Sequence, residues 1–118
     1  MPGLNRRRRV GHAIQRELPE LLRSLNDPRV DDLISFSSVD VSPDLNRAVI
    51  YFTHMGVEDL TETLHGLQHA AGYLRRGIAR RLNSKRVPYL DFVVDELPTS
   101  TSRIDGLLRD AAEKDGRY

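Results

Sequence analysis

Two histidines in the middle of the chain have a spacing that could bind a metal ion. His65 and His69 are four residues apart, so on a helix both imidazoles would face the same side. The catalytic zinc pattern needs a glutamate directly after the first histidine, whereas the spacer here is Gly66-Leu67-Gln68, with no evident third ligand. We therefore expect no metal and no cofactor.

Other side chains that could carry catalysis are absent or scattered. The 118 residues include no cysteine, which excludes disulfides, thiolate metal sites and thiol nucleophiles. His54 and the serines form no nucleophile elbow, and no phosphate-binding loop is present. A small α+β enzyme would need three polar groups that converge in a pocket, and the sequence offers no such trio. The sequence predicts a protein that is not an enzyme.

Positive charge is concentrated in two stretches, although the formal net charge of the chain is only +1. Residues 1–16 sum to +5 and residues 63–90 to +6, while the remainder of the chain is negative. No acidic residue lies between Glu62 and Asp91. A chain that sorts its charges in this way presents a basic patch to a polyanion, and we expect that polyanion to be RNA.

The basic side chains and two rings beside them are the candidate binding residues. Arginine bridges phosphate oxygens with two donors, and a neighbouring ring can stack on an unpaired base. The predicted phosphate contacts are Arg7, Arg8, Arg9, Arg75, Arg76, Arg80, Arg81, Lys85 and Arg86, and the predicted stacking residues are His69 and Tyr73.

Two alternatives to RNA binding remain open. One is a solvated helix face, but such a face usually intersperses Glu or Asp for internal ion pairs, which this one lacks. The other is duplex DNA, whose readers usually present Asn or Gln among the arginines of an exposed helix. Gln68 is alone in that role, so DNA is disfavoured.

Hydrophobic periodicity predicts two helical regions that position these side chains. The first runs from about Arg7 to Leu25, with a kink or break near Glu17–Leu18 because Pro19 lies inside it. The second starts near Asp59 and is closed by Val87-Pro88. Its apolar stripe is Leu60, Leu64, Leu67, Ala71, Leu74, Ile78 and Leu82, and the opposite face carries His65, His69, Tyr73, Arg76 and Arg80.

Three strands complete the predicted domain. They span residues 34–41, 48–53 and 90–94. The apolar positions of the first strand change phase at Ser37-Ser38, which indicates a β-bulge. The turn composition of Ser42-Pro43-Asp44-Leu45 makes the first two strands antiparallel. With a short final helix near Ile104–Ala111, the order is that of an α+β domain with helices on one face of a small sheet.

The predicted domain organisation has three parts. Residues 1–6 form a flexible basic arm, residues 7–97 a single folded domain, and residues 98–118 a connector, a short helix and a frayed tail. Such an arm would add phosphate contacts and make affinity fall with salt.

Six sequence pieces between about Arg9 and Leu108 occur together in a recognisable order. They are Arg9-Val10, Asp27-Pro28-Arg29-Val30, Val39-Asp40-Val41-Ser42-Pro43-Asp44-Leu45, Ala48-Val49-Ile50-Tyr51, Ala70-Ala71-Gly72-Tyr73-Leu74-Arg75, and Pro88-Tyr89-Leu90-Asp91-Phe92 with Asp95. In these pieces the chain resembles the ribosome-binding factor A family, bacterial assembly factors of the small ribosomal subunit.

The resemblance implies a single KH-like domain of the type II order, α-β-β-α-α-β. KH domains clamp the nucleic-acid backbone with a Gly-x-x-Gly loop, which this chain lacks. The family has instead a helix interrupted at Ala-x-Gly, and this motif falls on Ala70, Ala71 and Gly72 here. The neighbouring arginines are therefore the better candidates for RNA contact.

The resemblance also implies a role and partners. It implies a non-catalytic factor that binds ribosomal RNA of the small subunit, supports late maturation and precursor processing, and is linked to growth in the cold. A GTPase that releases the protein from the subunit is a further expected partner, and the protein itself is expected to be a monomer. No stretch approaches the roughly 20 apolar residues that cross a bilayer, and the basic N-terminus is not a secretory signal, so we expect a cytoplasmic protein.

Overall fold

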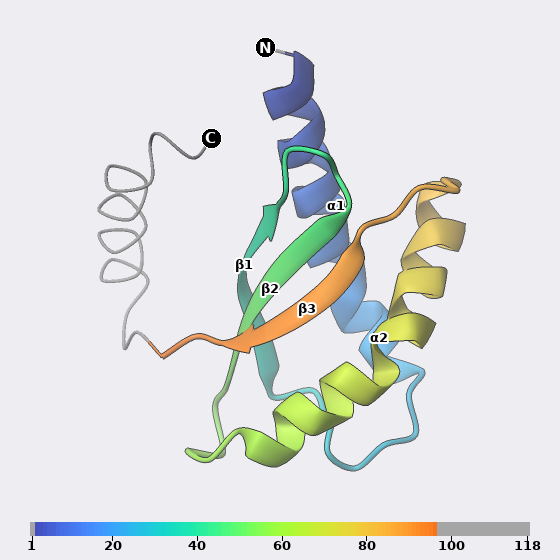
Figure 1. Ribbon diagram of the computed structural model, residues 1–118. Helices are drawn as coiled ribbons and strands as arrows, with labels where there is room; N and C mark the ends of the chain where they lie inside the picture. Colours follow the sequence, from blue (N-terminus) through green and yellow to red (C-terminus); the bar gives the residue numbers. More distant parts are fainter. Residues whose placement is uncertain (1, 97–118) are drawn as a thin grey trace.

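Two helices cover one face of a three-stranded sheet (Figure 1), which confirms the predicted α+β class. The computed structural model describes residues 2–96. The elements in chain order are α1 (Pro2–Arg23), β1 (Ile34–Val41), β2 (Arg47–His54), α2 (Thr61–Leu82) and β3 (Tyr89–Val94). The predicted final helix and tail lie outside the described residues.

The sheet has the order β1-β2-β3, with β2 in the centre. β1 and β2 are antiparallel, and their register shifts between Phe36 and Ser38, so the predicted bulge at Ser37 is confirmed. β3 is parallel to β2, with Ala48 opposite Leu90. Parallel neighbours need a long crossover, and α2 supplies it by packing on β3.

The core lies between the sheet and both helices. α1 contributes Ile14 and Leu18, and the centre of β2 contributes Ile50 and Phe52, all fully buried. The predicted stripe of α2 faces this core, with Leu74 fully buried. Leu60, Leu67, Leu74 and Ile78 are buried, and Leu64, Ala71 and Leu82 are partly buried against them. The predicted phase of the long helix is therefore confirmed.

α1 differs from the prediction at its start and at its proline. It begins at Pro2 rather than Arg7, so Arg6–Arg9 lie on the helix and not on an arm ahead of it. It also continues through Pro19, so the alternative of a break there is wrong. A proline inside a helix costs about 3 kcal/mol. The buried leucines on both sides of Pro19 contribute about 1.5–3 kcal/mol each, which is enough to retain the helix.

α2 runs unbroken from Thr61 to Leu82, so the predicted interruption at Ala70, Ala71 and Gly72 is wrong as a break in the helix. Its axis nevertheless turns sharply about midway along (Figure 1). A glycine costs a helix only about 1 kcal/mol relative to alanine, which the buried stripe easily outweighs. Within the described residues the order is therefore α-β-β-α-β, one helix fewer than predicted.

Close approach of the backbone occurs at two other glycines of α2. A Cβ added to Gly66 would lie 2.8 Å from Val30 Cγ2, and one added to Gly77 would lie 2.6 Å from Leu21 Cδ2. At Gly72 the nearest atom is Arg76 Nη1 at 3.4 Å, on a flexible side chain. The glycines that let other segments pack on α2 are thus Gly66 and Gly77.

The end of α2 also comes earlier than Val87-Pro88. Asn83 adopts the left-handed conformation, with φ 50° and ψ 48°. The amide of Ser84 donates to the carbonyl of Ala79 at 3.0 Å, in the pattern of a left-handed helix cap. The chain therefore leaves the helix at Asn83, and a short segment of residues 83–88 leads into β3.

Candidate nucleic-acid interface

The predicted basic residues come from three segments that meet at one end of the molecule. In Figure 1 the start of α1, the second half of α2 and the segment 83–88 all lie toward the end where the N-terminus is marked. In the structure, some of these cations form hydrogen bonds or ion pairs with other residues of the chain, and others have no such partner among the described residues.

Arg75 is engaged within the fold. Its Nε donates a hydrogen bond to the carbonyl of Val87 at 3.0 Å. Its guanidinium carbon lies 4.1 Å from the centroid of the Tyr89 ring, a cation–π distance. Arg75 therefore holds the segment before β3 against α2, a role that the charge pattern alone did not reveal.

Arg81 is engaged as well. Its Nη1 donates to Glu17 Oε2 at 3.0 Å and to Glu20 Oε2 at 2.9 Å, both on α1. The hydrogen bonds that the Arg81 guanidinium donates to Glu20 and Glu17 raise its pKa. Arg81 thus links the two helices, and two carboxylates offset its charge.

Four cations of the second basic stretch have no such partner. Arg76, Arg80, Lys85 and Arg86 are exposed, and their side chains make no hydrogen bond or ion pair with the described part of the chain. Arg80 lies in the last turn of α2, where a positive charge also complements the helix dipole. Their guanidinium and ammonium groups are available to an external anion.

The first basic stretch divides in the same way. Arg7 is half-buried, and its Nε donates to the carbonyl of Val41 at 2.9 Å, which joins α1 to the end of β1. Arg6, Arg8 and Arg9 are exposed on the same helix, with no ion pair to the residues described.

The two predicted stacking residues differ in their surroundings. His69 is exposed on α2, as predicted. Tyr73 is half-buried against the core, and its hydroxyl shares a hydrogen bond of 2.7 Å with Ser24 Oγ. Tyr73 thus helps to join the two helices. No group of three potential metal ligands occurs within residues 2–96, so His65 and His69 gain no third ligand there.

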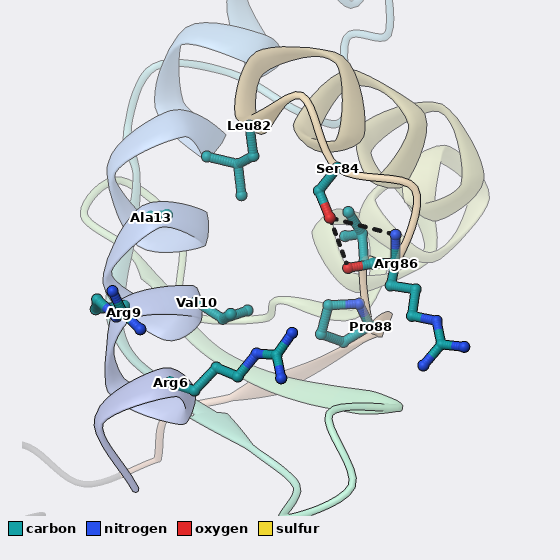
Figure 2. Close-up of a pocket in the computed structure, with 9 residues that line it drawn as sticks. Arg6, Arg9, Val10, Ala13, Leu82, Ser84, Arg86 and Pro88 are labelled. Atoms are coloured by element: carbon teal, nitrogen blue, oxygen red, sulfur yellow. Dashed lines mark hydrogen bonds between the residues drawn. The ribbon is translucent and has the colours of Figure 1, made fainter. Parts of the chain in front are cut away.

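A hollow of about 300 Å³ opens between α1 and the segment that follows α2 (Figure 2). Its lining combines apolar and basic side chains. The lining residues are Arg6, Arg9, Val10, Ala13, Leu82, Ser84, Arg86, Val87 and Pro88. In Figure 2, Arg6 reaches from α1 toward Pro88, and Arg86 extends away on the far side of Pro88.

Sequence reasoning placed Arg6 on a flexible arm that adds phosphate contacts, and it did not predict that Arg6 lines a hollow. Its signal is the spacing of Arg6, Arg9, Val10 and Ala13, which places them on one helix face only if the helix extends to Pro2. Because residues 1–6 were predicted to form a flexible arm, this helix face was not predicted.

A second hollow, of about 570 Å³, lies at the other end of the sheet. Glu58, Asp59, Asp95 and Glu96 are among the side chains that line it. This negative lining would repel RNA, so the basic end is the candidate interface. In the part of the chain that the structure describes, neither helix is long and apolar enough to span a membrane.

A one-sided α+β domain that gathers unpaired cations at one end has a surface complementary to a polyanion. The chain belongs to the ribosome-binding factor A family, because the model of that family matches residues 6–108. It is a family of ribosome-binding factors and not of enzymes, as predicted.

Individual relatives agree with this assignment. The chain is 42% identical over 113 residues to ribosome-binding factor A of Thioalkalivibrio sulfidiphilus, a match that covers 94% of this chain and 87% of the relative. A Thermotoga maritima structure described as a ribosome-binding factor A is 31% identical, with a TM-score of 0.67, over 80% of this chain and 92% of that one.

A third similar set of coordinates is a homology model of Thermus thermophilus ribosome-binding factor A, as fitted into the cryo-electron microscopy map of its complex with the 30S subunit. It is 26% identical to this chain, with a TM-score of 0.57, and the match covers 75% of this chain and 89% of that one.

Proposed function

We propose that this protein is a non-catalytic assembly factor that binds ribosomal RNA of the small subunit through its basic end. Support comes from its family and from the similar Thermus thermophilus protein, which was fitted into a complex with the 30S subunit. The single observation that carries the RNA contact is the set of exposed cations Arg76, Arg80, Lys85 and Arg86, which have no partner among the described residues.

The contact surface in this proposal is narrower than the whole basic run. Arg75 and Arg81 act mainly within the fold, through Val87 and through Glu17 and Glu20. Arg8 and Arg9 of α1 support the contact, and exposed His69 is the better stacking candidate than Tyr73, whose hydroxyl is engaged by Ser24. Each arginine that meets a phosphate displaces a counterion, so affinity falls as salt rises.

The finer role follows from the resemblance to the family. It comprises a KH-like domain that uses arginines in place of the Gly-x-x-Gly clamp, action late in subunit maturation, support of precursor processing and a contribution to growth in the cold. A monomer that acts in the cytoplasm and is released by a GTPase completes the proposal.

The test compares two double variants of equal charge. Arg76→Gln with Arg80→Gln should weaken co-sedimentation with small subunits and lower the slope of log affinity against log salt by roughly two. The matched control is Arg16→Gln with Arg23→Gln, which removes two exposed charges from α1. If the first variant folds normally and keeps wild-type affinity across salt, Arg76 and Arg80 are a solvated face and the proposed surface is wrong.

A second measurement separates RNA from DNA and small from large subunits. The wild-type protein should co-sediment with small subunits rather than with large subunits. At equal salt it should bind folded RNA more tightly than duplex DNA, because it lacks the amide side chains that read base edges in the major groove. Equal binding to both nucleic acids would assign the basic end to general electrostatic attraction.

A further inference from the structure

We infer that the hollow between α1 and the segment 82–88 receives one unpaired RNA base, with arginines at its rim on the flanking phosphates. The inference rests on the proposed RNA binding and adds to it the kind of RNA that is bound. The hollow selects a single-stranded nucleotide, since a base within a duplex is stacked and paired and cannot enter it.

The interior of the hollow is apolar and small. Val10 and Ala13 of α1 line one side, and Leu82, Val87 and Pro88 from the end of α2 and the segment after it complete the apolar lining. In Figure 2, Val10 points across toward Pro88, with Leu82 and Ser84 on the third side. A volume of about 300 Å³ is at the lower end of the range for ligand pockets, which suits one planar base better than a large ligand.

The rim carries positive charge and no acid. Arg6, Arg9 and Arg86 are the ionisable residues in the lining, and none has an ion-pair partner among residues 5–96. Both faces of a base and its two flanking phosphates would meet complementary groups here. A base can also stack on the plane of a guanidinium, and Arg6 reaches over the hollow toward Pro88 (Figure 2).

One wall of the hollow is held in place by its own hydrogen bonds. Ser84 Oγ donates to the carbonyl of Arg86 at 3.2 Å and accepts from the Arg86 amide at 3.3 Å. The next residue, Val87, is held as well, because its carbonyl accepts a hydrogen bond from Arg75 Nε. The segment is therefore shaped before RNA arrives, which lowers the ordering cost of binding.

The first test needs no protein variant. The probe is an RNA hairpin with a short single-stranded extension, and each nucleotide of the extension is replaced in turn by an abasic one. Wild-type full-length protein should lose about tenfold in affinity at one position of the extension, the effect expected for one held base. Equal effects at every position, or none, would overturn the inference.

The second test fills the hollow without changing its charge. Ala13→Leu should lower affinity for the intact probe about tenfold, and the sensitive abasic position should then cause no further loss. His12→Leu is the control, because it places the same side chain at the neighbouring exposed position, which does not line the hollow. The salt slope of Ala13→Leu should equal that of the wild type, whereas Arg6→Gln should lower the slope by about one.

The outcomes separate this inference from the proposed function. If the wild-type protein binds no RNA, both the proposed function and this inference are wrong. If RNA binds with a normal salt slope and Ala13→Leu leaves affinity and the abasic pattern unchanged, only the inference falls. If Ala13→Leu instead abolishes binding of a glutamate-rich peptide with one leucine, and leaves RNA binding intact, the hollow belongs to a protein partner and the inference is wrong.

Discussion

The two hollows of the molecule have linings of opposite charge, and the charged side chains around them have different partners. At the end with the loops α1–β1 and β2–α2, three carboxylates accept hydrogen bonds from nearby groups. Asp27 accepts from the Arg29 amide at 2.9 Å, Asp31 from His54 Nε2 at 2.9 Å, and Asp59 from the Thr61 amide at 3.0 Å. These bonds order turns and the start of α2.

At the other end, most of the exposed cations make no hydrogen bond or ion pair with the described residues. Arg76, Arg80, Lys85 and Arg86 face solvent without a partner there. Unpaired like charges repel one another, so apart from the helix-dipole contribution of Arg80 their accumulation adds little to the stability of α2 or of the segment after it. The difference teaches that Asp27, Asp31 and Asp59 serve the folding of their loops, whereas Arg76, Arg80, Lys85 and Arg86 are available for a ligand.

The largest expected effect concerns the glycine that joins the helices near the basic end. Gly77→Ala adds a Cβ 2.6 Å from Leu21 Cδ2, and this overpacking should cost about 1–3 kcal/mol, less the roughly 1 kcal/mol gained in helix propensity. Gly72→Ala is the control, because its Cβ would meet only Arg76 Nη1 at 3.4 Å, on a flexible side chain, and it should stabilise the protein by up to about 1 kcal/mol. Urea unfolding measures both.

Equal effects of these two alanines would mean that α1 does not approach α2 at Gly77. The two helices that carry the exposed cations would then lack this contact with each other.

A smaller effect is expected at two neighbouring arginines, because Arg81 pairs with carboxylates and Arg80 has no partner among the described residues. Arg81→Gln removes the contacts to Glu17 and Glu20 and should lower the urea midpoint slightly, because partly exposed ion pairs contribute little to stability. Arg80→Gln should change the free energy of unfolding by less than about 0.5 kcal/mol. RNA affinity should show the reverse order, with the greater loss in Arg80→Gln.

Urea unfolding and RNA titration at fixed salt measure this contrast on the same two proteins. Should Arg81→Gln leave stability unchanged and weaken RNA binding more than Arg80→Gln, Arg81 would belong with the available cations.

The smallest effect is a pH dependence at the acidic end. Hydrogen bonds from the Arg29 side chain and amide lower the pKa of the Asp27 carboxyl from 3.8 to about 2. Because the folded pKa is the lower one, this carboxylate stabilises the fold above pH 3.8, and its contribution is lost as the pH falls from 3.8 to about 2. Asp27→Asn should therefore lose less stability across this interval than the wild type.

Thermal unfolding at several pH values gives the measurement. Asp32→Asn is the control, since Asp32 lies exposed in the same loop without a hydrogen bond to the described residues. If stability depends on pH in Asp27→Asn as steeply as in the wild type, the Asp27 carboxylate does not contribute to folding.

Local sequence patterns predicted the elements whose signal is periodic. The bulge at Ser37 was predictable because apolar positions on a strand report which face they occupy, so a change of phase marks an extra residue. The buried face of α2 was predictable for the same reason. Pro19 shows the limit, since the burial that retains the helix around it depends on packing and not on the local sequence.

The candidate site was predictable only as a set of charges. Whether an arginine is available depends on partners that lie far away in the chain, as Glu17 and Glu20 do from Arg81. The hollow is formed by α1 and the segment after α2, which no local pattern connects. The charge count therefore found the basic end of the molecule, and the structure identified which side chains there have no partner among the described residues.

The bulge at Ser37 has a consequence for how copies of this protein meet. β1 is an edge strand of the described sheet, and a regular edge offers a row of unpaired amides and carbonyls on which another chain can add a strand. The extra residue at Ser37 breaks the spacing of that row and increases its local twist. Natural sheets use this device against aggregation, so β1 is poorly suited to strand addition by a second copy even at high concentration.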